Sequence, residues 1–324
     1  MSSQFYSYSK VLITGVSGLL GSWMAKSLIE KNILIQGIAI DKSKNDLLSS
    51  MHLLDKFKLE YIDISKADKL TEYFDNNFFD IVFHLAAQTQ VIEANINPIK
   101  TFESNIQGTW NILNECNKRR IPVVVASSDK AYGEAENLPY KENFSLNGIY
   151  PYEFSKSVTD LLARTFKLTY DTKVTTLRCG NIYGGGDLNW DRLIPGVCNW
   201  LFNDKTPVLR TDGNFKRDWV FVEDVVNAYL LVGEALFSDN SKVSLSYNFA
   251  GDSYKSVIEV YNIISMKIMN KIIFPKIVLD SDKEIKDQYL DSTKILKELN
   301  IKSKYSFDEG IEKTINWYKD YFLK

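Results

Sequence analysis

The chain has 324 residues, of which 45% are hydrophobic and 25% are charged, a mixture typical of globular proteins. Its formal net charge of -2 at pH 7 excludes the strongly basic surface of a nucleic-acid-binding protein, so we expect no nucleic-acid partner. Three cysteines without Cys-x-x-Cys spacing and only two histidines argue against a disulfide framework and against a bound metal.

The N-terminal stretch MSSQFYSYSK is polar and lacks the charged flank and apolar segment of a secretory signal peptide. No apolar run approaches the length that spans a bilayer. The odd number of cysteines fits a reducing compartment. The sequence therefore predicts a cytoplasmic protein without a membrane partner.

Short apolar runs alternate with amphipathic stretches through the first half of the chain. The predicted strands are residues 10–16, 32–40, 58–63, 79–87, 121–128 and 173–181, and the predicted helices are residues 19–32, 66–77, 99–120 and 151–170. Nearly continuous apolar strands that alternate with helices indicate an α/β fold, a doubly wound parallel sheet covered on both faces. Such sheets bind ligands at the carboxyl ends of their strands.

The pattern loosens after residue 183, where a glycine-rich loop, GGGDLNWDRLIPG, begins a mixture of short helices and strands. We predict a first domain over residues 1–183 and a smaller C-terminal α/β lobe over 184–216 and 251–324. The segment 217–250 is expected to fold back onto the first domain. The apolar stripes of the helices at 99–120 and 151–170 are either dimer faces or core, and core is the commoner fate of such a stripe.

The first predicted strand runs directly into TGVSGLLGSW, a Gly-x-x-Gly-x-x-Gly pattern. A dinucleotide needs a tight turn, close backbone approach to its pyrophosphate and a helix N-terminus at its phosphates. An ordinary glycine turn would have the same spacing, but the position between a strand and a helix favours a cofactor. The predicted cofactor-binding residues here are Gly15, Gly18, Leu19, Leu20 and Gly21.

Acidic and small residues follow the next strands. Asp41 ends the second strand about 20 residues after the last glycine, where a carboxylate binds the ribose hydroxyls and repels the 2′-phosphate of NADP, so NAD is favoured. Alternatively, Asp41 is only a turn residue before KSKND, and Lys42 and Lys44 lie close to it in the sequence. The ends of the third and fourth strands are expected to border the adenosine and phosphates, through Asp63, Ile64, Leu85, Ala86 and Ala87. His84 is expected to be packed rather than catalytic.

Tyr152 and Lys156 form a Tyr-x-x-x-Lys pair at the start of a predicted helix. Residues four apart share a helix face, and a nearby cation lowers the pKa of a phenol, which would make Tyr152 a base usable near neutral pH. The motif alone is weak, because Tyr6 and Lys10 repeat it in the N-terminal stretch. Its position after a strand that ends in Ser127 and Ser128 distinguishes Tyr152, since a serine hydroxyl can share the same substrate oxygen.

Together, Gly-x-x-Gly-x-x-Gly, a strand-end serine and Tyr-x-x-x-Lys resemble the extended short-chain dehydrogenase/reductases that act on nucleotide sugars. The resemblance continues through HLAAQ, SNIQGTWNIL, LRCGNIYG, KRDWVFVEDV and YNFAG. It implies a Rossmann domain, bound NAD, a nucleoside-diphospho-sugar substrate, a substrate-binding lobe and a homodimer. It also implies that Ser128, Tyr152 and Lys156 carry out hydride transfer, and that the substrate contacts Gln88, Asn105, Asn181, Asp191, Arg192 and Arg217.

Asp129 and Lys130 follow the serine directly. Epimerases that resemble this chain tend to have small residues there, whereas SSDKAYG and GGGDLNWDRLIPG resemble CDP-glucose 4,6-dehydratases. In that role Asp129 protonates the departing O6, while Lys130 removes the C5 proton or holds the water or enolate involved. A solvated strand-end ion pair is the alternative. KRDWVFVEDV is similar to the broader epimerase/dehydratase pattern instead.

The resemblance therefore favours an NAD-dependent nucleotide-sugar 4,6-dehydratase that makes a 4-keto-6-deoxy sugar for a cell-surface glycan, with CDP-glucose as the leading substrate. A 4-epimerase, a 4-dehydrogenase that stops at the ketone, and a catalytically inactive NAD-binding regulator are the alternatives. The intact set of Ser128, Tyr152 and Lys156 argues against the regulator.

Overall fold

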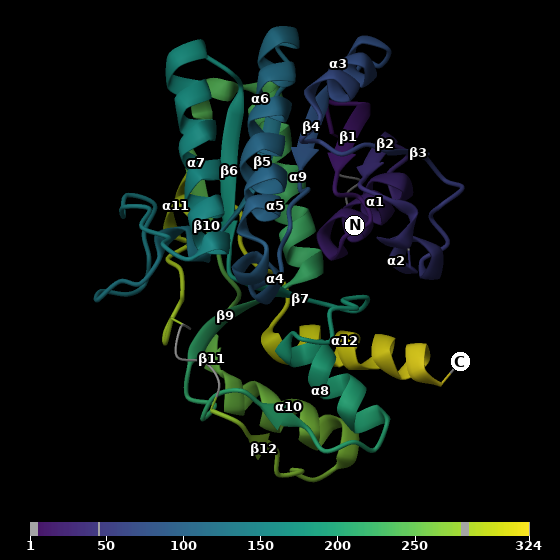
Figure 1. Cartoon of the computed structure of the whole chain (residues 1–324), viewed down its shortest axis with the longest axis vertical. Coiled ribbons are helices and arrows are strands. Elements are labelled where there is room, and N and C mark those ends of the chain that lie inside the picture. The colour runs from purple at the N-terminus through teal and green to yellow at the C-terminus, as the bar shows by residue number, and fades with distance from the viewer. Residues whose placement is uncertain (1–5, 45, 280–284, 324) are drawn as a thin grey trace.

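A large sheet with helices on both faces makes up the upper part of the molecule in Figure 1, and a smaller group of helices and short strands lies below it. The computed structural model describes residues 6–44, 46–279 and 285–323. Residues 1–5, part of the stretch considered above for a signal peptide, lie outside this description. Among the described residues, no helix is both long and apolar enough to cross a membrane.

The large sheet has seven parallel strands in the order β10-β6-β5-β4-β1-β2-β3. Strands β2 and β3 lie on one side of β1, and β4 and the later strands lie on the other side, so the strand order reverses between β1 and β4. Doubly wound sheets bind ligands at such a point. This order confirms the predicted doubly wound fold. The strands are β1 (Lys10–Thr14), β2 (Leu34–Ala39), β3 (Lys58–Tyr61), β4 (Ile81–His84), β5 (Val123–Ser128), β6 (Val174–Cys179) and β10 (Ser246–Phe249).

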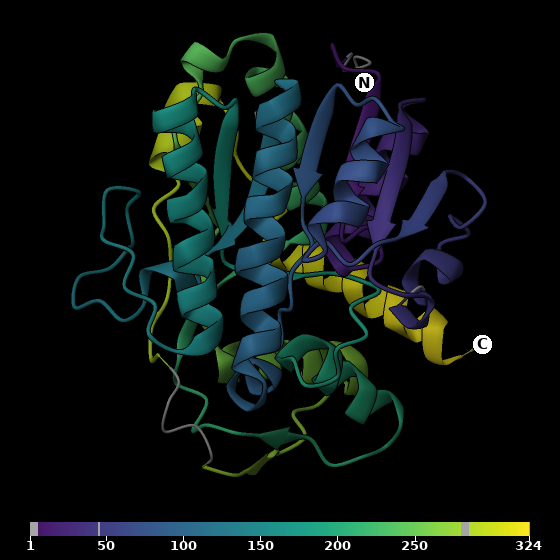
Figure 2. The same cartoon turned by 45° about the horizontal axis from the view of Figure 1, so that its top comes forward.

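Alternate residues of each strand face opposite sides of the sheet and divide its core into two clusters. On β1, Val11 and Ile13 belong to one cluster and Leu12 to the other. The first cluster includes residues of α1 (Leu19–Glu30), α2 (Asp46–Ser50), α9 (Val222–Ser238) and α11 (Thr293–Leu299). The second includes residues of α3 (Ala67–Asp75), α6 (Gly108–Arg119) and α7 (Pro151–Tyr170). Figure 2 shows α6 and α7 side by side on one face.

The stretch 99–120, predicted as one helix, forms three consecutive pieces. After α4 (Val91–Ile96), α5 (Pro98–Phe102) leads into a π-helical turn, η2 (Glu103–Gln107), and then into α6. A π turn widens the helical repeat, and such turns often occur at functional sites. Here the turn contains Asn105, which is buried and makes internal hydrogen bonds.

The second part consists of two small sheets and three helices. One sheet has three strands, β7 (Asn181–Tyr183), β9 (Lys216–Phe221) and β11 (Tyr254–Ser256), and the other has two, β8 (Val208–Leu209) and β12 (Lys276–Ile277). The helices α8 (Leu193–Phe202), α10 (Val257–Met269) and α12 (Phe307–Phe322) pack around a third core cluster. Short 3-10 turns occur at η1 (Lys42–Lys44), η3 (Asp129–Tyr132) and η4 (Asn240–Lys242).

The chain crosses between the two parts more than once. Within 217–250, α9 packs on the large sheet and β10 adds a strand to it, but β9 pairs with strands of the small sheet. Within 251–324, α11 packs against α9 and β10 rather than with the lobe, because Ile295 joins the first core cluster. The boundaries are therefore more interleaved than the predicted ranges.

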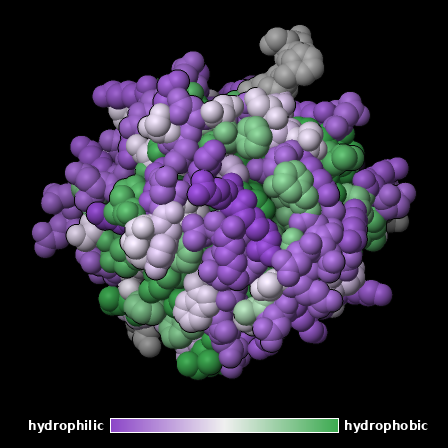
Figure 3. Space-filling view, turned by 90° about the horizontal axis from the view of Figure 1, so that it is seen from above, coloured by the Kyte–Doolittle hydropathy of each residue, from purple (hydrophilic) through white to green (hydrophobic). Residues whose placement is uncertain are grey.

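The two parts meet at the carboxyl ends of the strands, where α1 contacts the lobe. Trp23 of α1 donates a hydrogen bond from Nε1 to the Gly185 carbonyl (2.8 Å), and the same helix packs on the third cluster. The opposite end of the molecule, seen from above in Figure 3, mixes hydrophilic residues with smaller hydrophobic groups.

Candidate active site

The carboxyl end of β5 leads directly into the 3-10 turn η3. Ser128 caps this turn by accepting a hydrogen bond from the Lys130 N–H (3.3 Å to Oγ). Helix α7 packs alongside, with the Ser157 hydroxyl donating to the Ala131 carbonyl (2.7 Å). The strand end, the turn and the first turns of α7 thus form one unit that carries the predicted catalytic residues Ser128, Asp129, Lys130, Tyr152 and Lys156.

Tyr152 lies at the start of α7 and is 8% exposed. Burial raises the pKa of Tyr152 to about 12, and Asp129 adds to this, while Arg192 and a hydrogen bond with Ser128 lower it. The sequence argument expected Lys156 to lower the pKa of this phenol. In the structure the cation that lowers the pKa of Tyr152 is Arg192 instead, and the loss of solvation outweighs it, so the net shift is upward.

Lys156 is 5% exposed and donates from Nζ to the Ala126 carbonyl on β5 (3.0 Å). Burial lowers the pKa of Lys156 to about 8, and Asp160, one helical turn further along α7, opposes this shift. His84 lies near this ammonium and is buried, with its two ring nitrogens 2.7 Å from the Thr14 hydroxyl and 3.0 Å from the Thr109 hydroxyl. Burial and Lys156 lower the pKa of His84 to about 3, so His84 is a neutral packed residue.

The three glycines that follow β1, Gly15, Gly18 and Gly21, differ in how much space a side chain would have. Gly15 has a φ of +72°, and a Cβ there would lie 2.7 Å from the Ala86 nitrogen. At Gly21 a Cβ would lie 2.3 Å from the Gly15 oxygen. Gly18 is the N-cap of α1, and a Cβ there would meet only the Gly15 oxygen at 3.4 Å. Two glycines are therefore required by the fold, and the third borders open space at a helix N-terminus, where phosphates bind.

Leu19 and Leu20 form the first turn of α1, and their side chains pack against the core cluster of the second lobe. Their predicted role in cofactor binding therefore rests on their backbone N–H groups, which lie at the free end of the helix. The side chains instead attach the helix to the lobe.

Asp41 and Asp63 both stabilise turns at strand ends. Asp41 is exposed and accepts hydrogen bonds from the Ser43 N–H (2.7 Å) and the Ser43 hydroxyl. Asp63 accepts hydrogen bonds from the Ser65 N–H (3.0 Å) and hydroxyl (2.8 Å). The turn role considered for Asp41 is thus present in the structure. Its contact with a ribose stays a prediction that this exposed position allows.

The ends of β3 and β4 are held to neighbouring elements through their backbone. The carbonyl of the buried Ile64 accepts a hydrogen bond from Asn111 (2.9 Å). The Leu85 N–H donates to the Thr14 carbonyl (3.1 Å), and the Ala86 N–H donates to the Thr14 hydroxyl (3.3 Å). These bonds place 85–87 beside the glycine loop, where a Cβ on Gly15 would collide with Ala86.

Asp129 is fully buried, and its Oδ1 accepts hydrogen bonds from the Ser128 hydroxyl (2.8 Å) and from Lys130 Nζ (3.2 Å). Its Oδ2 is buried without a hydrogen-bond partner among the described residues. Lys130 Nζ also donates to Asn181 Oδ1 on β7 (3.2 Å). The pair is therefore largely buried beside Ser128 and not a solvated turn, and Asn181 is joined to it through Lys130.

The loop before α8 contains two predicted substrate residues, Asp191 and Arg192, whose side chains have different partners. Arg192 pairs with Asp187 (3.0 Å) and lies near enough to Tyr152 to lower the pKa of its phenol. Asp191 is exposed and pairs with Arg210 (3.2 Å). The structure thus brings Arg192 near Tyr152, the predicted catalytic residue, whereas Asp191 is exposed, and its substrate contact stays a prediction.

Asn105 is 1% exposed and uses its amide inside the protein. Its Oδ1 accepts from the Gln88 N–H (2.7 Å), and its Nδ2 donates to the Gln88 carbonyl (2.9 Å) and to the Ser155 hydroxyl (3.0 Å). The Gln88 side chain donates to the Gln90 carbonyl (2.9 Å) and to Thr101 Oγ1 (3.2 Å). Asn105 and Gln88 thus use their amide groups to hold the loop after β4 in place. This favours a structural role for both residues over the predicted direct contact with the substrate.

Arg217 lies on β9, is 8% exposed and donates to the Lys216 (2.9 Å), Ile285 (2.7 Å) and Lys286 carbonyls. The neighbouring Asp218 accepts from the Leu290 N–H, and burial raises the pKa of Asp218 to about 7. The two side chains hold residues 285–290 against β9. The predicted contact of Arg217 with a diphosphate stays a prediction.

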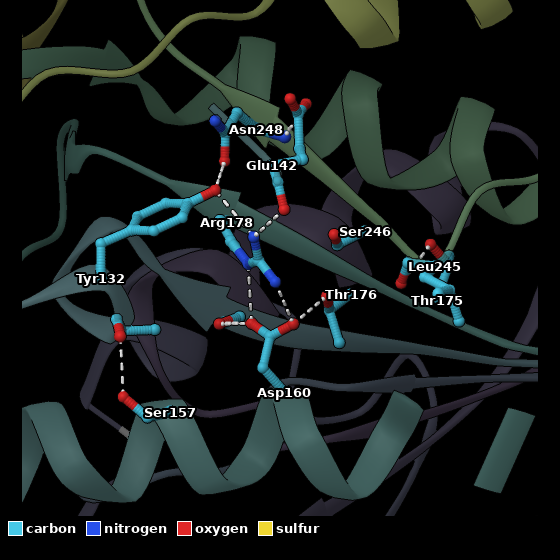
Figure 4. Close-up of polar contacts among 12 residues, drawn as sticks. Tyr132, Glu142, Ser157, Asp160, Thr175, Thr176, Arg178, Leu245, Ser246 and Asn248 are labelled. Carbon is cyan, nitrogen blue, oxygen red and sulfur yellow. Dashed lines mark hydrogen bonds and ion pairs between the residues drawn. The ribbon is translucent and has the colours of Figure 1, made fainter. Parts of the chain in front are cut away.

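Asp160 and Arg178 form a buried ion pair that the sequence did not reveal (Figure 4). Asp160 extends from α7 toward Arg178 of β6, which also donates to the Tyr132 hydroxyl (2.7 Å). Ser127 and Thr176 donate to the same carboxylate. The network connects four elements, α7, β5, β6 and η3. A buried pair of this kind fixes one arrangement more than it adds stability.

The residues around the glycine loop fit a dinucleotide. Gly18 borders open space at the first turn of α1, and the backbone of 85–87 lies against Gly15. Asp41 is exposed at the end of β2, the neighbouring strand. The described residues contain no group of three or more His, Cys, Asp or Glu side chains that could hold a metal ion.

Comparisons with known proteins agree with this arrangement. Residues 11–248 match the model of the NAD dependent epimerase/dehydratase family. The chain is 30% identical over 258 residues to the CDP-glucose 4,6-dehydratase of Salmonella typhimurium, covering 76% of this chain and 72% of that protein. It is 32% identical over 326 residues to a putative UDP-glucose 4-epimerase of Methanocaldococcus jannaschii, covering 96% and 98%.

The fold is also that of a solved dTDP-glucose 4,6-dehydratase from Bacillus anthracis in complex with NAD, with a TM-score of 0.83 and 23% identity over 96% of each chain. The predicted family and cofactor are confirmed. The chain belongs to the NAD-dependent epimerase/dehydratase family and is an enzyme of that family with NAD as its cofactor.

Proposed function

We propose that this enzyme is a nucleotide-sugar 4,6-dehydratase, which converts a nucleoside-diphospho-hexose to the 4-keto-6-deoxy sugar. The observation that carries the proposal is the buried carboxyl of Asp129, which contacts the Ser128 hydroxyl (2.8 Å) and keeps Oδ2 without a partner among the described residues. A 4-epimerase needs no acid at this position, because no hydroxyl leaves its substrate. A dehydratase needs an acid that can reach O6.

Each residue has a chemical role in this reaction. Tyr152 accepts the O4 proton, and Ser128 binds O4 by a hydrogen bond. NAD held at the glycine loop of Gly15, Gly18 and Gly21 would supply the acceptor for the C4 hydride and its donor to C6, and its positive charge would favour the phenolate of Tyr152. The C4 ketone acidifies C5–H. A water held by Lys130 takes the C5 proton, and Asp129 gives its proton to O6, which leaves as water. Lys130 and Arg192 supply positive charge around the sugar.

The nucleotide and the sugar are narrower parts of the proposal. SSDKAYG and GGGDLNWDRLIPG resemble CDP-glucose 4,6-dehydratases, and one relative with that name is 30% identical to this chain. We therefore propose CDP-glucose as the first substrate to test. UDP-, dTDP- and GDP-glucose and the N-acetylated sugars form the rest of the panel.

Product analysis of that panel tests the proposal. Purified enzyme with NAD should give a product lighter by one water. A product of unchanged mass with inverted C4 would establish the 4-epimerase, which similarity to a putative UDP-glucose 4-epimerase over 96% of the chain favours as second candidate. Accumulation of NADH with the C4 ketone would establish a 4-dehydrogenase. Loss of turnover with retained NAD binding in Tyr152→Phe would exclude an inactive regulator.

We further propose a cytoplasmic homodimer. The three cysteines, Cys116, Cys179 and Cys198, are unpaired and buried, which fits a reducing compartment. The adjacent helices α5, α6 and α7 leave large apolar side chains at least two-fifths exposed, and a second copy would cover them. These residues are Ile99, Trp110, Phe154, Leu161 and Leu168.

The domain division is proposed in a revised form. The NAD-binding domain comprises the chain up to residue 180 together with α9, β10 and α11, because these three elements pack on the large sheet. The remaining elements after residue 180, beginning with β7, form the substrate lobe, because the lobe contains the small sheets and the third core cluster.

A further inference from the structure

The turn η3 is a short segment that needs contacts from outside to hold its position. It has four residues, and among them are Asp129 and Lys130, which the proposed function assigns to water loss. Its own hydrogen bonds are long, with the Gly133 N–H 3.2 Å from the Lys130 oxygen and the Lys130 N–H 3.3 Å from Ser128 Oγ. Because 3-10 turns have poor hydrogen-bond geometry, these bonds add little rigidity.

Both ends of η3 are attached to strands of the large sheet. At its start, Ser128 ends β5 and is paired with Cys179 of β6. At its end, Tyr132 is 1% exposed, and its hydroxyl accepts a hydrogen bond from Arg178 Nη1 and donates one to Asn248 Oδ1, each at 2.7 Å. Figure 4 shows the phenol extending toward these two side chains, which belong to the paired strands β6 and β10. The turn is thus held between β5 and two further strands.

The ring of Tyr132 is fixed as firmly as its hydroxyl. It stacks on the ring of Tyr140, with centroids 4.7 Å apart and planes 7° apart. The Tyr140 hydroxyl donates to the Gly133 carbonyl (2.6 Å), directly after η3. Arg178 and Asn248 are both buried, so each would lose a hydrogen bond inside the core without the Tyr132 hydroxyl. Such a loss costs free energy and loosens the attachment.

Helix α7 fixes the arginine that binds Tyr132. Asp160 accepts hydrogen bonds from Arg178 Nε (3.0 Å) and Nη2 (2.8 Å), and the remaining nitrogen, Nη1, reaches the phenol. The same helix carries Tyr152 and Lys156 near its start. One helix therefore carries the groups predicted to oxidise the sugar and, through Arg178, supports the turn that holds the groups assigned to water loss.

We propose that Tyr132 is a positioning residue for water loss: its bound hydroxyl fixes the end of η3 and so sets where Asp129 and Lys130 lie relative to the sugar. This inference rests on the proposed 4,6-dehydratase function. The phenol acts through the turn and not on the sugar, because its hydroxyl is buried and bound to two protein groups. The residues predicted for C4 oxidation lie on β5 and α7, outside η3, so that step does not depend on this attachment.

An effect through the segment between η3 and α7 is the alternative. Arg178 Nη1 also donates to the Glu142 carbonyl (3.4 Å), and the Asn248 N–H donates to the Glu142 carboxylate (2.9 Å). Glu142 lies in the segment that leads to α7, so a disturbed network would displace Tyr152 instead. The two explanations differ in the step that becomes slow. A displaced Tyr152 slows C4 oxidation, whereas a displaced Asp129 slows only water loss.

The test uses full-length Tyr132→Phe with NAD and the nucleotide-glucose that the wild type dehydrates. Phenylalanine keeps the stacked ring but removes the hydroxyl that Arg178 and Asn248 bind. Near-ultraviolet absorbance follows the reduced nicotinamide, and mass spectrometry follows the product lighter by water. We expect the reduced nicotinamide to form at the wild-type rate and to accumulate, while water loss falls about 10²-fold, the effect of a misplacement of about 1 Å.

Two further variants separate position from stability. Tyr8→Phe is the matched control, because Tyr8 is 2% exposed in the first core cluster and its hydroxyl donates to the Leu230 carbonyl (3.4 Å). Both steps should keep their wild-type rates in this control. Asn248→Leu removes the acceptor of the Tyr132 hydroxyl at similar side-chain size, and it should give the same selective loss as Tyr132→Phe. Partial unfolding slows both steps together, so the ratio of water loss to oxidation reports on position.

Three results would overturn the inference. The first is water loss at the wild-type rate in folded Tyr132→Phe, or in Asn248→Leu if Tyr132→Phe does not fold. The second is a fall of oxidation in step with water loss, which would assign the network to Tyr152 or to the stability of the fold. The third is a wild-type enzyme that forms an epimer or a ketone without water loss. Only this third result also overturns the 4,6-dehydratase function.

Discussion

Asp160 on α7 binds Arg178 on β6 through two hydrogen bonds, Nε to Oδ2 at 3.0 Å and Nη2 to Oδ1 at 2.8 Å (Figure 4). Asp160 also opposes the lowering of the pKa of Lys156, which burial brings to about 8. One carboxylate thus serves two cations: it fixes Arg178 in the core and keeps Lys156 charged.

The first prediction concerns the pH profile of Asp160→Asn. Without the carboxylate, the pKa of Lys156 falls further below about 8, so the charged form is lost at lower pH. The fall of kcat at alkaline pH should therefore begin at a lower pH than in the wild type. Unpaired Arg178 also destabilises the fold, by about 3–5 kcal/mol as for other broken buried pairs. Ser127→Ala is the control, since it removes a hydrogen bond to Asp160 but no charge. An unchanged onset of this fall in Asp160→Asn would contradict the role.

The second prediction separates oxidation from water loss. Asp129→Asn removes the proton that O6 needs but keeps the side-chain volume. Reduction of NAD by substrate should persist, while release of the dehydrated product falls about 10²–10⁴-fold. Asp55→Asn is the matched control, because Asp55 is exposed and pairs only weakly with Lys56 (3.8 Å). Full dehydration by Asp129→Asn, measured by mass spectrometry, would refute the acid role.

The third prediction compares two glycines of the cofactor loop. In Gly21→Ala the new Cβ would lie 2.3 Å from the Gly15 oxygen, so the melting temperature should fall with or without NAD. In Gly18→Ala the Cβ meets only one atom at 3.4 Å, so the melting temperature without NAD should stay close to the wild-type value. The added methyl group enters the space expected for the pyrophosphate, so the stabilisation by NAD should shrink. Equal stabilisation of Gly18→Ala and wild type by NAD would argue against phosphate binding there.

The fourth prediction concerns association. Leu161 on α7 is 46% exposed, and Leu161→Glu places a charge in the proposed dimer face. We expect light scattering to show a dimer for the wild type and a monomer for this variant, with an unchanged circular dichroism spectrum. Leu279→Glu, at a residue 78% exposed elsewhere, should leave the dimer intact. A monomeric wild type would contradict the assembly.

The sequence predicted features that depend on neighbouring residues in the chain. The run Val123–Val125 must be a buried strand, and the spacing of Gly15, Gly18 and Gly21 matches a turn between a strand and a helix. Both of these structural inferences held, because they depend on the local sequence of the strand and the turn. The order of strand, serine and Tyr152 also predicted a reaction centre at the end of β5, since parallel sheets bind ligands at the carboxyl ends of their strands, and that location stays a prediction.

Features that depend on packing between distant segments were not predicted. Whether Asn105 faces a ligand or the protein depends on a π turn, which the helical periodicity of 99–120 does not show. The outward direction of Asp191 depends on Arg210 in a later loop.

The hydrogen bond from Trp23 to Gly185 attaches α1 to the second part of the molecule. Helix α1 begins at the glycine loop, and Trp23, one turn later, contacts the loop that leads to Arg192. The loop predicted to hold the cofactor and the loop before α8 therefore share one helix as a common support. If two ligands favoured the same position of this helix, each would strengthen the binding of the other by the same factor.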